Sequence, residues 1–136
     1  MEMNTDELIN KAQSVTNVQK SGDCEWGGVG CAIETDNGEV YTGVCLDTPS
    51  SMGCCAEHNA IGSMITNSKS KINKIVAIWK DEKDDVYVIP PCGCCRELMF
   101  QINPDNIDAE IILDKNKSVS LKDLLPYPYK DNFKKV

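Results

Sequence analysis

Residues 29–45 read VGCAIETDNGEVYTGVC, two short apolar runs on either side of a polar segment. The runs Val29 to Thr35 and Val40 to Cys45 each have the length and composition of a β-strand. Between them, Asp36-Asn37-Gly38 is a strong hairpin signal, because Asn-Gly accepts the positive φ angles that tight turns require. The sequence therefore predicts an antiparallel β-hairpin.

Outward from this hairpin, helices and strands are predicted to alternate. Asp6 to Val18 carries apolar residues at helical spacing, with Thr5 as a candidate cap. Lys115 to Lys117 is expected to be a turn. The other expected elements are helices at Cys55 to Thr66 and Cys92 to Ile102, a helical turn at Leu121 to Leu125, and strands at Ile75 to Trp79, Val86 to Ile89 and Ala109 to Leu113.

A hairpin followed by alternating helices and strands favours an α/β fold. The expected architecture is a three-layer α/β/α sandwich, with a mixed sheet of about five strands and helices on both faces. The 136 residues are about the size of one ordinary domain and contain no repeat or Pro/Gly-rich linker. We therefore expect residues 1–136 to form a single domain.

The charge balance limits the partners. Lys and Arg number 14 and Asp and Glu 21, which gives a formal net charge of −7. Polymeric nucleic acid is an unexpected partner, because attraction to phosphate backbones needs clustered Lys and Arg. A small neutral or cationic molecule fits better. No apolar run approaches the roughly 20 residues that span a bilayer, and the acidic first ten residues do not resemble a signal peptide. We expect a cytoplasmic protein without membrane association.

Cysteine spacing carries the chemical signal. In a reducing cytosol, clustered cysteines are more often metal ligands or catalytic groups than disulfides. Two segments stand out among the eight cysteines: Cys54-Cys55-Ala56-Glu57-His58 and Pro91-Cys92-Gly93-Cys94-Cys95-Arg96. Each lies where a helix is predicted to begin. The free N–H groups and the positive end of the dipole at a helix start stabilise a thiolate, the form that binds zinc.

Three of these cysteines are predicted to hold one zinc ion. Cys92 and Cys95 are three residues apart, so their sulfurs lie on one side of a first helical turn. Cys55 supplies a third sulfur from the other helix. Three protein ligands leave one tetrahedral position open, which is typical of catalytic zinc. Glu57, two residues past Cys55, is the candidate group for moving protons.

Other interpretations of the cysteines stay open at this point. Cys92-x-x-Cys95 alone is compatible with a redox pair, although this leaves Cys55 and Glu57 unexplained. A closed structural site with Cys54 or Cys94 as the fourth ligand is a second alternative. The remaining cysteines are most simply small buried apolar residues; these are Cys24, Cys31 and Cys45.

Cys55-Ala56-Glu57 and Pro91-Cys92-Gly93-x-Cys95 together make the chain resemble the cytidine deaminase superfamily. Within it, the chain looks like the small homotetrameric members, which include cytidine deaminase and blasticidin S deaminase. The resemblance implies a cytidine deaminase-like fold and a zinc-dependent hydrolase that converts cytidine or deoxycytidine to uridine or deoxyuridine and ammonia. Blasticidin S, or another small aminopyrimidine, is the alternative substrate. A non-catalytic, zinc-stabilised binding protein is the third possibility.

The resemblance also implies substrate contacts. Cys45 stands where the family carries a ribose-binding amide, and Asp47 where it carries a carboxylate. A thiol is a poor replacement for an amide, whereas Asp47 keeps a shortened carboxylate. Ala56 of the zinc motif is also expected to contact the substrate. Asp47 could instead cap the turn toward Pro49.

Two aromatic residues and two cationic side chains complete the expected site. Trp26 stands beside the position of a family aromatic, and Tyr129 matches a C-terminal aromatic that reaches a substrate site. Each is equally compatible with ordinary packing. His58 and Arg96 are expected near the thiolates, where they would offset the net negative charge of three thiolates and one zinc(II). A plain surface position for His58 is the alternative.

Overall fold

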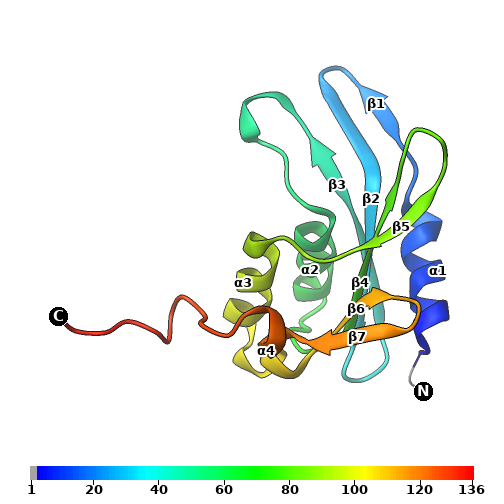
Figure 1. Ribbon diagram of the computed structural model, residues 1–136. Helices are drawn as coiled ribbons and strands as arrows, with labels where there is room; N and C mark the ends of the chain where they lie inside the picture. The colour runs from blue at the N-terminus through cyan, green and yellow to red at the C-terminus, as the bar shows by residue number, and fades with distance from the viewer. Residues whose placement is uncertain (1–2) are drawn as a thin grey trace.

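The computed structural model describes residues 3–136, which form one mixed sheet with helices on both faces (Figure 1). The helices are α1 (Thr5–Val15), α2 (Ala56–Thr66), α3 (Gly93–Ile102) and α4 (Leu121–Leu124), with 3-10 turns at Pro49–Ser51 and Pro104–Asp108. The strands are β1 (Gln19–Ser21), β2 (Cys24–Thr35), β3 (Val40–Asp47), β4 (Ile72–Lys80), β5 (Val86–Ile89), β6 (Glu110–Asp114) and β7 (Lys117–Ser120).

Strand β2 organises the sheet. The order is β1-β2-β4-β6-β7, with β3 also paired to β2 and β5 to β4; only the β4–β6 pair is parallel. The predicted hairpin is confirmed as β2–β3, in which Ile33 pairs with Tyr41. Gly38 alone takes a positive φ in its turn, 84°, and the Thr35 N–H donates to the Glu39 carbonyl at 2.8 Å. The loop is therefore a three-residue turn rather than a two-residue Asn-Gly turn.

The two faces of the sheet bury two separate cores, which confirms the three-layer prediction. Successive strand residues point to opposite faces. Cys31 and Ile33 of β2 pack with α2 and α3, whereas Ala32 between them packs with α1. Figure 1 shows α1 on one side of the sheet and α2 and α3 on the other. Within residues 3–136, no helix is long and apolar enough to cross a membrane.

The expectation of about five strands was wrong, because the sheet has seven. The missed strands are β1, with sequence QKS and all residues exposed, and β7, with sequence KSVS. Neither carries an apolar alternation, so neither gives a strand signal; both form because a neighbouring strand offers backbone groups to pair with. The expected turn at Lys115 to Lys117 therefore ends one residue inside β7.

The start and end of α1 also differ from the prediction. The cap is Asn4 rather than Thr5: its side-chain oxygen accepts from the Glu7 N–H at 2.8 Å, and the Glu7 carboxylate accepts from the Asn4 N–H at 3.2 Å. This reciprocal pair is a capping box. The helix ends at Val15, three residues before the predicted Val18, because the chain turns there to enter β1.

A glycine lets α2 lie directly on β3. A Cβ atom at Gly43 would stand 2.2 Å from the Ala60 nitrogen, so helix and strand backbones meet with no side chain between them. Beside this contact, the Asn59 side-chain amide donates to the Val44 carbonyl at 2.6 Å. These two contacts fix how α2, and therefore its N-terminus, lies over the sheet.

We predict that Gly43→Ala lowers the free energy of unfolding by about 1–3 kcal/mol, the usual cost of overpacking. Gly62→Ala is the matched control in α2: a Cβ there meets nothing within 4 Å, so this change should stabilise the protein by about 0.5–1 kcal/mol. Urea unfolding of both variants is the measurement. A Gly43→Ala protein as stable as wild type would show that α2 can move away from β3 without cost.

Candidate metal centre and substrate pocket

Both cysteine motifs lie at helix starts, as predicted. Cys55 is the N-cap of α2 and Cys92 is the N-cap of α3, each with extended backbone angles and without a side-chain capping bond. Cys95 lies in the first turn of α3 and is fully buried. The free N–H groups at both helix starts therefore face the region where the sulfurs gather.

The sulfur atoms have the spacing of a zinc site. Cys55 Sγ lies 3.6 Å from Cys92 Sγ, and Cys92 Sγ lies 3.4 Å from Cys95 Sγ. Zinc–sulfur bonds of about 2.3 Å in a tetrahedron place sulfurs about 3.8 Å apart. Thiolates also belong to the ligands that select zinc over harder cations. The residues present therefore fit one zinc ion.

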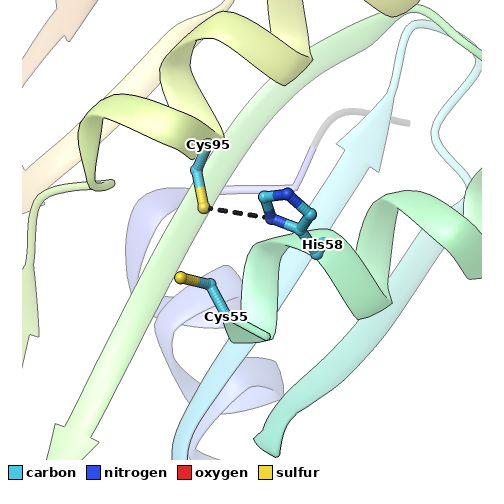
Figure 2. A group of neighbouring side chains, drawn as sticks. All are labelled: Cys55, His58 and Cys95. Carbon is cyan, nitrogen blue, oxygen red and sulfur yellow. Dashed lines mark hydrogen bonds between the residues drawn. The ribbon is translucent and has the colours of Figure 1, made fainter. Parts of the chain in front are cut away.

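His58 lies directly beside this cluster. Its Nδ1 atom is 3.4 Å from Cys95 Sγ and its Nε2 atom 3.6 Å from Cys94 Sγ. Figure 2 shows the imidazole and the Cys55 and Cys95 sulfurs converging, and one donor atom from each lies within 4.8 Å of the others. Two overlapping donor sets result: Cys55 and Cys95 are common to both, and either Cys92 or His58 is the third.

The two cysteines proposed as alternative fourth ligands make other contacts. Cys54 Sγ donates to Asn59 Oδ1 at 3.5 Å, and Cys94 Sγ faces His58 from an exposed position on α3. Of the cysteines expected to be simple apolar residues, Cys31 and Cys45 are buried and Cys24 is half-buried. Burial raises the pKa of the Cys31 thiol well above its usual value, so that thiol stays uncharged in the core.

The protonation states of the three cysteines differ in the metal-free protein. Burial raises the pKa of Cys55 to about 11 and raises the pKa of Cys95 further. Burial also tends to raise the pKa of Cys92. Hydrogen bonds from the Cys95 N–H and from the neighbouring thiols outweigh this effect, so the Cys92 pKa is lowered. Metal binding at this site must therefore release protons, mainly from Cys55 and Cys95.

Glu57 is a buried carboxyl group in the first turn of α2. It is 4% exposed, and burial is the main cause that raises its pKa; its own backbone N–H, His58 and the Cys95 thiol act in the opposite direction. A carboxyl group with a raised pKa takes up a proton more readily than an ordinary one. Glu57 also lines a cavity, so it has access to a bound molecule.

The cavity has a volume of about 600 Å³, within the range of small-molecule sites. It contains six residues that the sequence assigned to the site and several that it missed. Its walls are formed by Gly28, Val29, Cys45, Leu46, Asp47, Thr48, Ser51, Gly53, Cys54, Cys55, Ala56, Glu57, Trp79, Ile89, Pro90 and Cys92. Asp47 and Glu57 are the only charged residues among them. The cavity therefore has no basic group to hold a phosphate.

The aromatic wall of the cavity comes from Trp79, which sequence reasoning assigned only to a strand. Trp79 pairs with Val29 across β4 and β2, and its ring stacks on Tyr87 with centroids 5.2 Å apart. The sequence feature that could have indicated Trp79 is its position at the end of the predicted strand Ile75 to Trp79, because that strand pairs with the hairpin. Trp26 pairs with Leu46 one strand away, is half-buried and is absent from the cavity wall.

Tyr129 is also absent from the cavity wall within one chain. It is 67% exposed, packs edge-on against Phe133 at 5.0 Å, and its N–H donates to Glu97 at 2.9 Å. Figure 1 shows the C-terminal segment running away from the sheet beyond α4.

Arg96 holds the turn that precedes α3. Arg96 Nε donates to the Pro91 carbonyl at 2.8 Å and Nη1 to the Leu124 carbonyl at 3.3 Å, which holds the turn that carries Cys92.

Cys45 Sγ accepts from the Val29 N–H at 3.3 Å and donates to Asp47 Oδ2 at 3.7 Å. Burial is the main cause that raises the Cys45 pKa, so its thiol keeps the proton that it shares with Asp47.

Comparison with known proteins agrees with this geometry. Residues 3–110 match the family model described as the cytidine and deoxycytidylate deaminase zinc-binding region. A blasticidin-S deaminase from Bacillus cereus is 34% identical over 109 residues, which is 76% of this chain and 78% of that protein.

Solved structures share the fold. Cytidine deaminase from Burkholderia pseudomallei superimposes with a TM-score of 0.73 and 24% identity, covering 93% of this chain and 100% of that one. Cytidine deaminase from Bacillus anthracis gives a TM-score of 0.70 and 24% identity, covering 90% and 86%. With the cysteine cluster, the fold and the match over residues 3–110 in agreement, this chain belongs to the cytidine and deoxycytidylate deaminase family of zinc-dependent hydrolytic enzymes.

Proposed function

We propose that this chain removes the amino group from the cytosine ring of a free, phosphate-free nucleoside-like molecule and releases it as ammonia. The observation that carries the proposal is that Glu57, Cys55 and Cys92 line one cavity of nucleoside size. The chemistry that bound zinc supplies there is a water activated for attack at neutral pH.

Glu57 is the proton carrier in this proposal. Its carboxylate accepts a proton from the attacking water and gives it to the ring nitrogen, and it then serves the departing amine in the same way. Hydrolysis consumes one water and releases one ammonia, so Glu57 returns to its starting state. Its burial and raised pKa support this role, because both favour a carboxyl group that readily takes up a proton.

The proposed zinc ligands are Cys55, Cys92 and Cys95, with one zinc per chain. His58 acts as the hydrogen-bonding partner of Cys95, and Arg96 fixes the turn before Cys92 through the Pro91 carbonyl. The Cys55–Cys92 and Cys92–Cys95 sulfur distances support this set, because 3.6 and 3.4 Å are close to the edge of a zinc–sulfur tetrahedron. The fourth position is then free for water.

We predict that Cys92→Ala purifies with little zinc, whereas His58→Ala keeps most of it and binds it about 10- to 100-fold more weakly, as for a partner that supports a ligand. Cys24→Ala is the control, since Cys24 is a half-buried cysteine of β2 outside the cluster. Elemental analysis and competition with a chelator measure the effect. Full zinc retention in Cys92→Ala together with loss in His58→Ala would make His58 the third ligand, and a four-sulfur shell by X-ray absorption would refute an open site.

Cytidine or deoxycytidine is the first candidate substrate. Asp47 offers a carboxylate that can accept from sugar hydroxyls, and its donor Cys45 holds it in place. Blasticidin S is the second candidate. The Bacillus cereus relative supports it, as does the thiol at Cys45 in place of the ribose-binding amide that the resemblance implies.

We expect the zinc-loaded protein to deaminate cytidine and deoxycytidine, with deoxycytidylate at least about 10-fold lower in kcat/KM than deoxycytidine. A factor of ten needs only about 1.4 kcal/mol, and a phosphate facing Asp47 in a cavity without basic residues costs at least that much. The panel also contains cytosine and blasticidin S, and the loss of the amino group is followed by ultraviolet absorbance.

Glu57→Gln is the control that ties turnover to this site. Zinc content should persist while kcat falls by at least about 10²-fold. The pKa of Glu57 is raised in the folded protein. The metal-free protein therefore loses stability as pH rises through that pKa, so metal-free Glu57→Gln should melt at a higher temperature than wild type at pH 7.

Preferential turnover of blasticidin S in the substrate panel would replace cytidine and deoxycytidine as the first candidate. A zinc-loaded protein inactive on every compound would favour a zinc-stabilised binding protein.

We further propose that residues 1–136 act as one domain in a cytoplasmic homotetramer. The single sheet and the eight free thiols support one domain and a reducing compartment. The exposed aromatics of the C-terminal segment support assembly, because tails of this kind commonly pack on another subunit. These residues are Tyr127, Tyr129 and Phe133.

The assembly prediction is a tetramer by light scattering, in which Tyr129→Ala raises the KM for nucleoside and leaves zinc content unchanged. Closed symmetric oligomers are the commonest assemblies, and the cavity wall lacks an aromatic from the tail within one chain. A fully active monomer would contradict the proposal.

A further inference from the structure

The inner metal site, formed by Cys55, Cys92 and Cys95, has two faces, and one of them lies outside the substrate cavity. Cys55 and Cys92 line the cavity wall. Cys95, His58 and Cys94 are absent from that wall. Cys95 is fully buried, and its sulfur lies 3.4 Å from Cys92 Sγ and 3.4 Å from His58 Nδ1. The buried thiol of Cys95 therefore connects the cavity face of the site to a second face at His58.

His58 and Cys94 place two further metal donors on this second face. Cys94 is exposed in the first turn of α3, and His58 is half-buried in the first turn of α2. Cys94 Sγ lies 3.6 Å from His58 Nε2. Zinc bonds of about 2.3 Å to sulfur and about 2.0–2.1 Å to nitrogen place two such donors about 3.6 Å apart in a tetrahedron. The pair therefore has the spacing of two ligands of one ion.

The two ring nitrogens of His58 face different partners. Figure 2 shows one nitrogen facing Cys95 and the other turned away from the Cys55 sulfur. A neutral imidazole carries a proton on one nitrogen and a free lone pair on the other. His58 can thus donate to Cys95 through Nδ1 while Nε2 binds a cation together with Cys94. A cation at Nε2 is then separated from the inner site by a single side chain.

We propose that His58 and Cys94 form an outer metal site, which binds a thiophilic divalent cation from solution and passes zinc to the inner site. This inference rests on the zinc ligands given in the proposed function. Thiolate and imidazole are ligands that suit zinc, and two protein ligands hold an ion more weakly than three thiolates at the neighbouring site. An ion held at the outer site is at a high effective concentration for the inner cysteines, so its transfer is faster than a new encounter from solution.

The transfer is an exchange of ligands without oxidation or reduction. Zinc(II) displaces the thiol proton of Cys94 when it binds, and Cys94 takes up a proton again when the ion moves inward. The inner thiols lose their protons to water as they replace the outer donors. Burial raises the pKa values of Cys55 and Cys95 in the metal-free protein. A cation held beside them favours their thiolates, so the outer site also assists the deprotonation that inner binding requires.

The rate of zinc loading tests the transfer. Metal-free protein receives zinc from a coloured chelator, whose absorbance follows the loss of the ion. Cys94→Ser, which keeps the size of the side chain and removes the thiol, should load about 3- to 10-fold more slowly than wild type. Its Kd for zinc should stay within about 2-fold of wild type, because the outer site is empty at equilibrium. Cys24→Ser, which changes a half-buried cysteine of β2, is the control and should load at the wild-type rate.

A cadmium titration of the metal-free protein tests the outer site itself. In wild type, the first equivalent fills the inner site, and a second, weaker equivalent should add further thiolate-to-metal absorbance in the ultraviolet. Cys94→Ser should show only the first equivalent. A wild-type loading rate in Cys94→Ser, or a second equivalent that persists in it, would overturn this inference alone. Full zinc retention in Cys92→Ala would overturn the proposed ligand set and this inference with it.

Discussion

The close approach of α2 to β3 at Gly43 is the constraint on which the site depends. With no side chain between the two backbones, the helix lies directly on the sheet, and its first residues meet the start of α3. Cys55 thereby comes within 3.6 Å of Cys92, although the two lie on different helices. The spacing of the cysteines in the sequence does not by itself make a metal centre. The centre forms because the fold holds the starts of α2 and α3 next to each other.

In the absence of a metal ion, burial disfavours the charged forms of the cysteine and glutamate side chains at this centre. The pKa values of Cys55 and Glu57 are both raised, chiefly because surrounding protein replaces water. A divalent cation reverses that balance, since it favours the thiolates and any neighbouring carboxylate. The same enclosure that disfavours the empty, charged centre strengthens each electrostatic contact once the ion is present. Metal binding and proton release are therefore one event here.

The sequence predicted the parts of this molecule whose causes are local. A hairpin around Asn37-Gly38 and the placement of Cys55 and Cys92 at helix starts follow from turn and helix-end chemistry that a few neighbouring residues determine. The edge strands β1 and β7 escaped prediction because β1 is fully exposed and β7 is only partly buried, so neither carries an apolar alternation. Trp79 and Thr48 escaped for another reason: Trp79 reads as a strand residue and Thr48 as a loop residue, and only the tertiary fold turns them toward one cavity.

Two backbone hydrogen bonds between Leu46 and Cys54 close the loop that joins β3 to α2, and this closure has an evolutionary consequence. Because Leu46 and Cys54 join its two ends, residues between them can change in length and composition without moving β3 or the first residue of α2. Loop variation of this kind is inexpensive in free energy when the ends are already held together. This part of the cavity wall and the metal-binding cysteines thus lie in adjacent but mechanically separate segments, so selection can diversify the first while leaving the second intact.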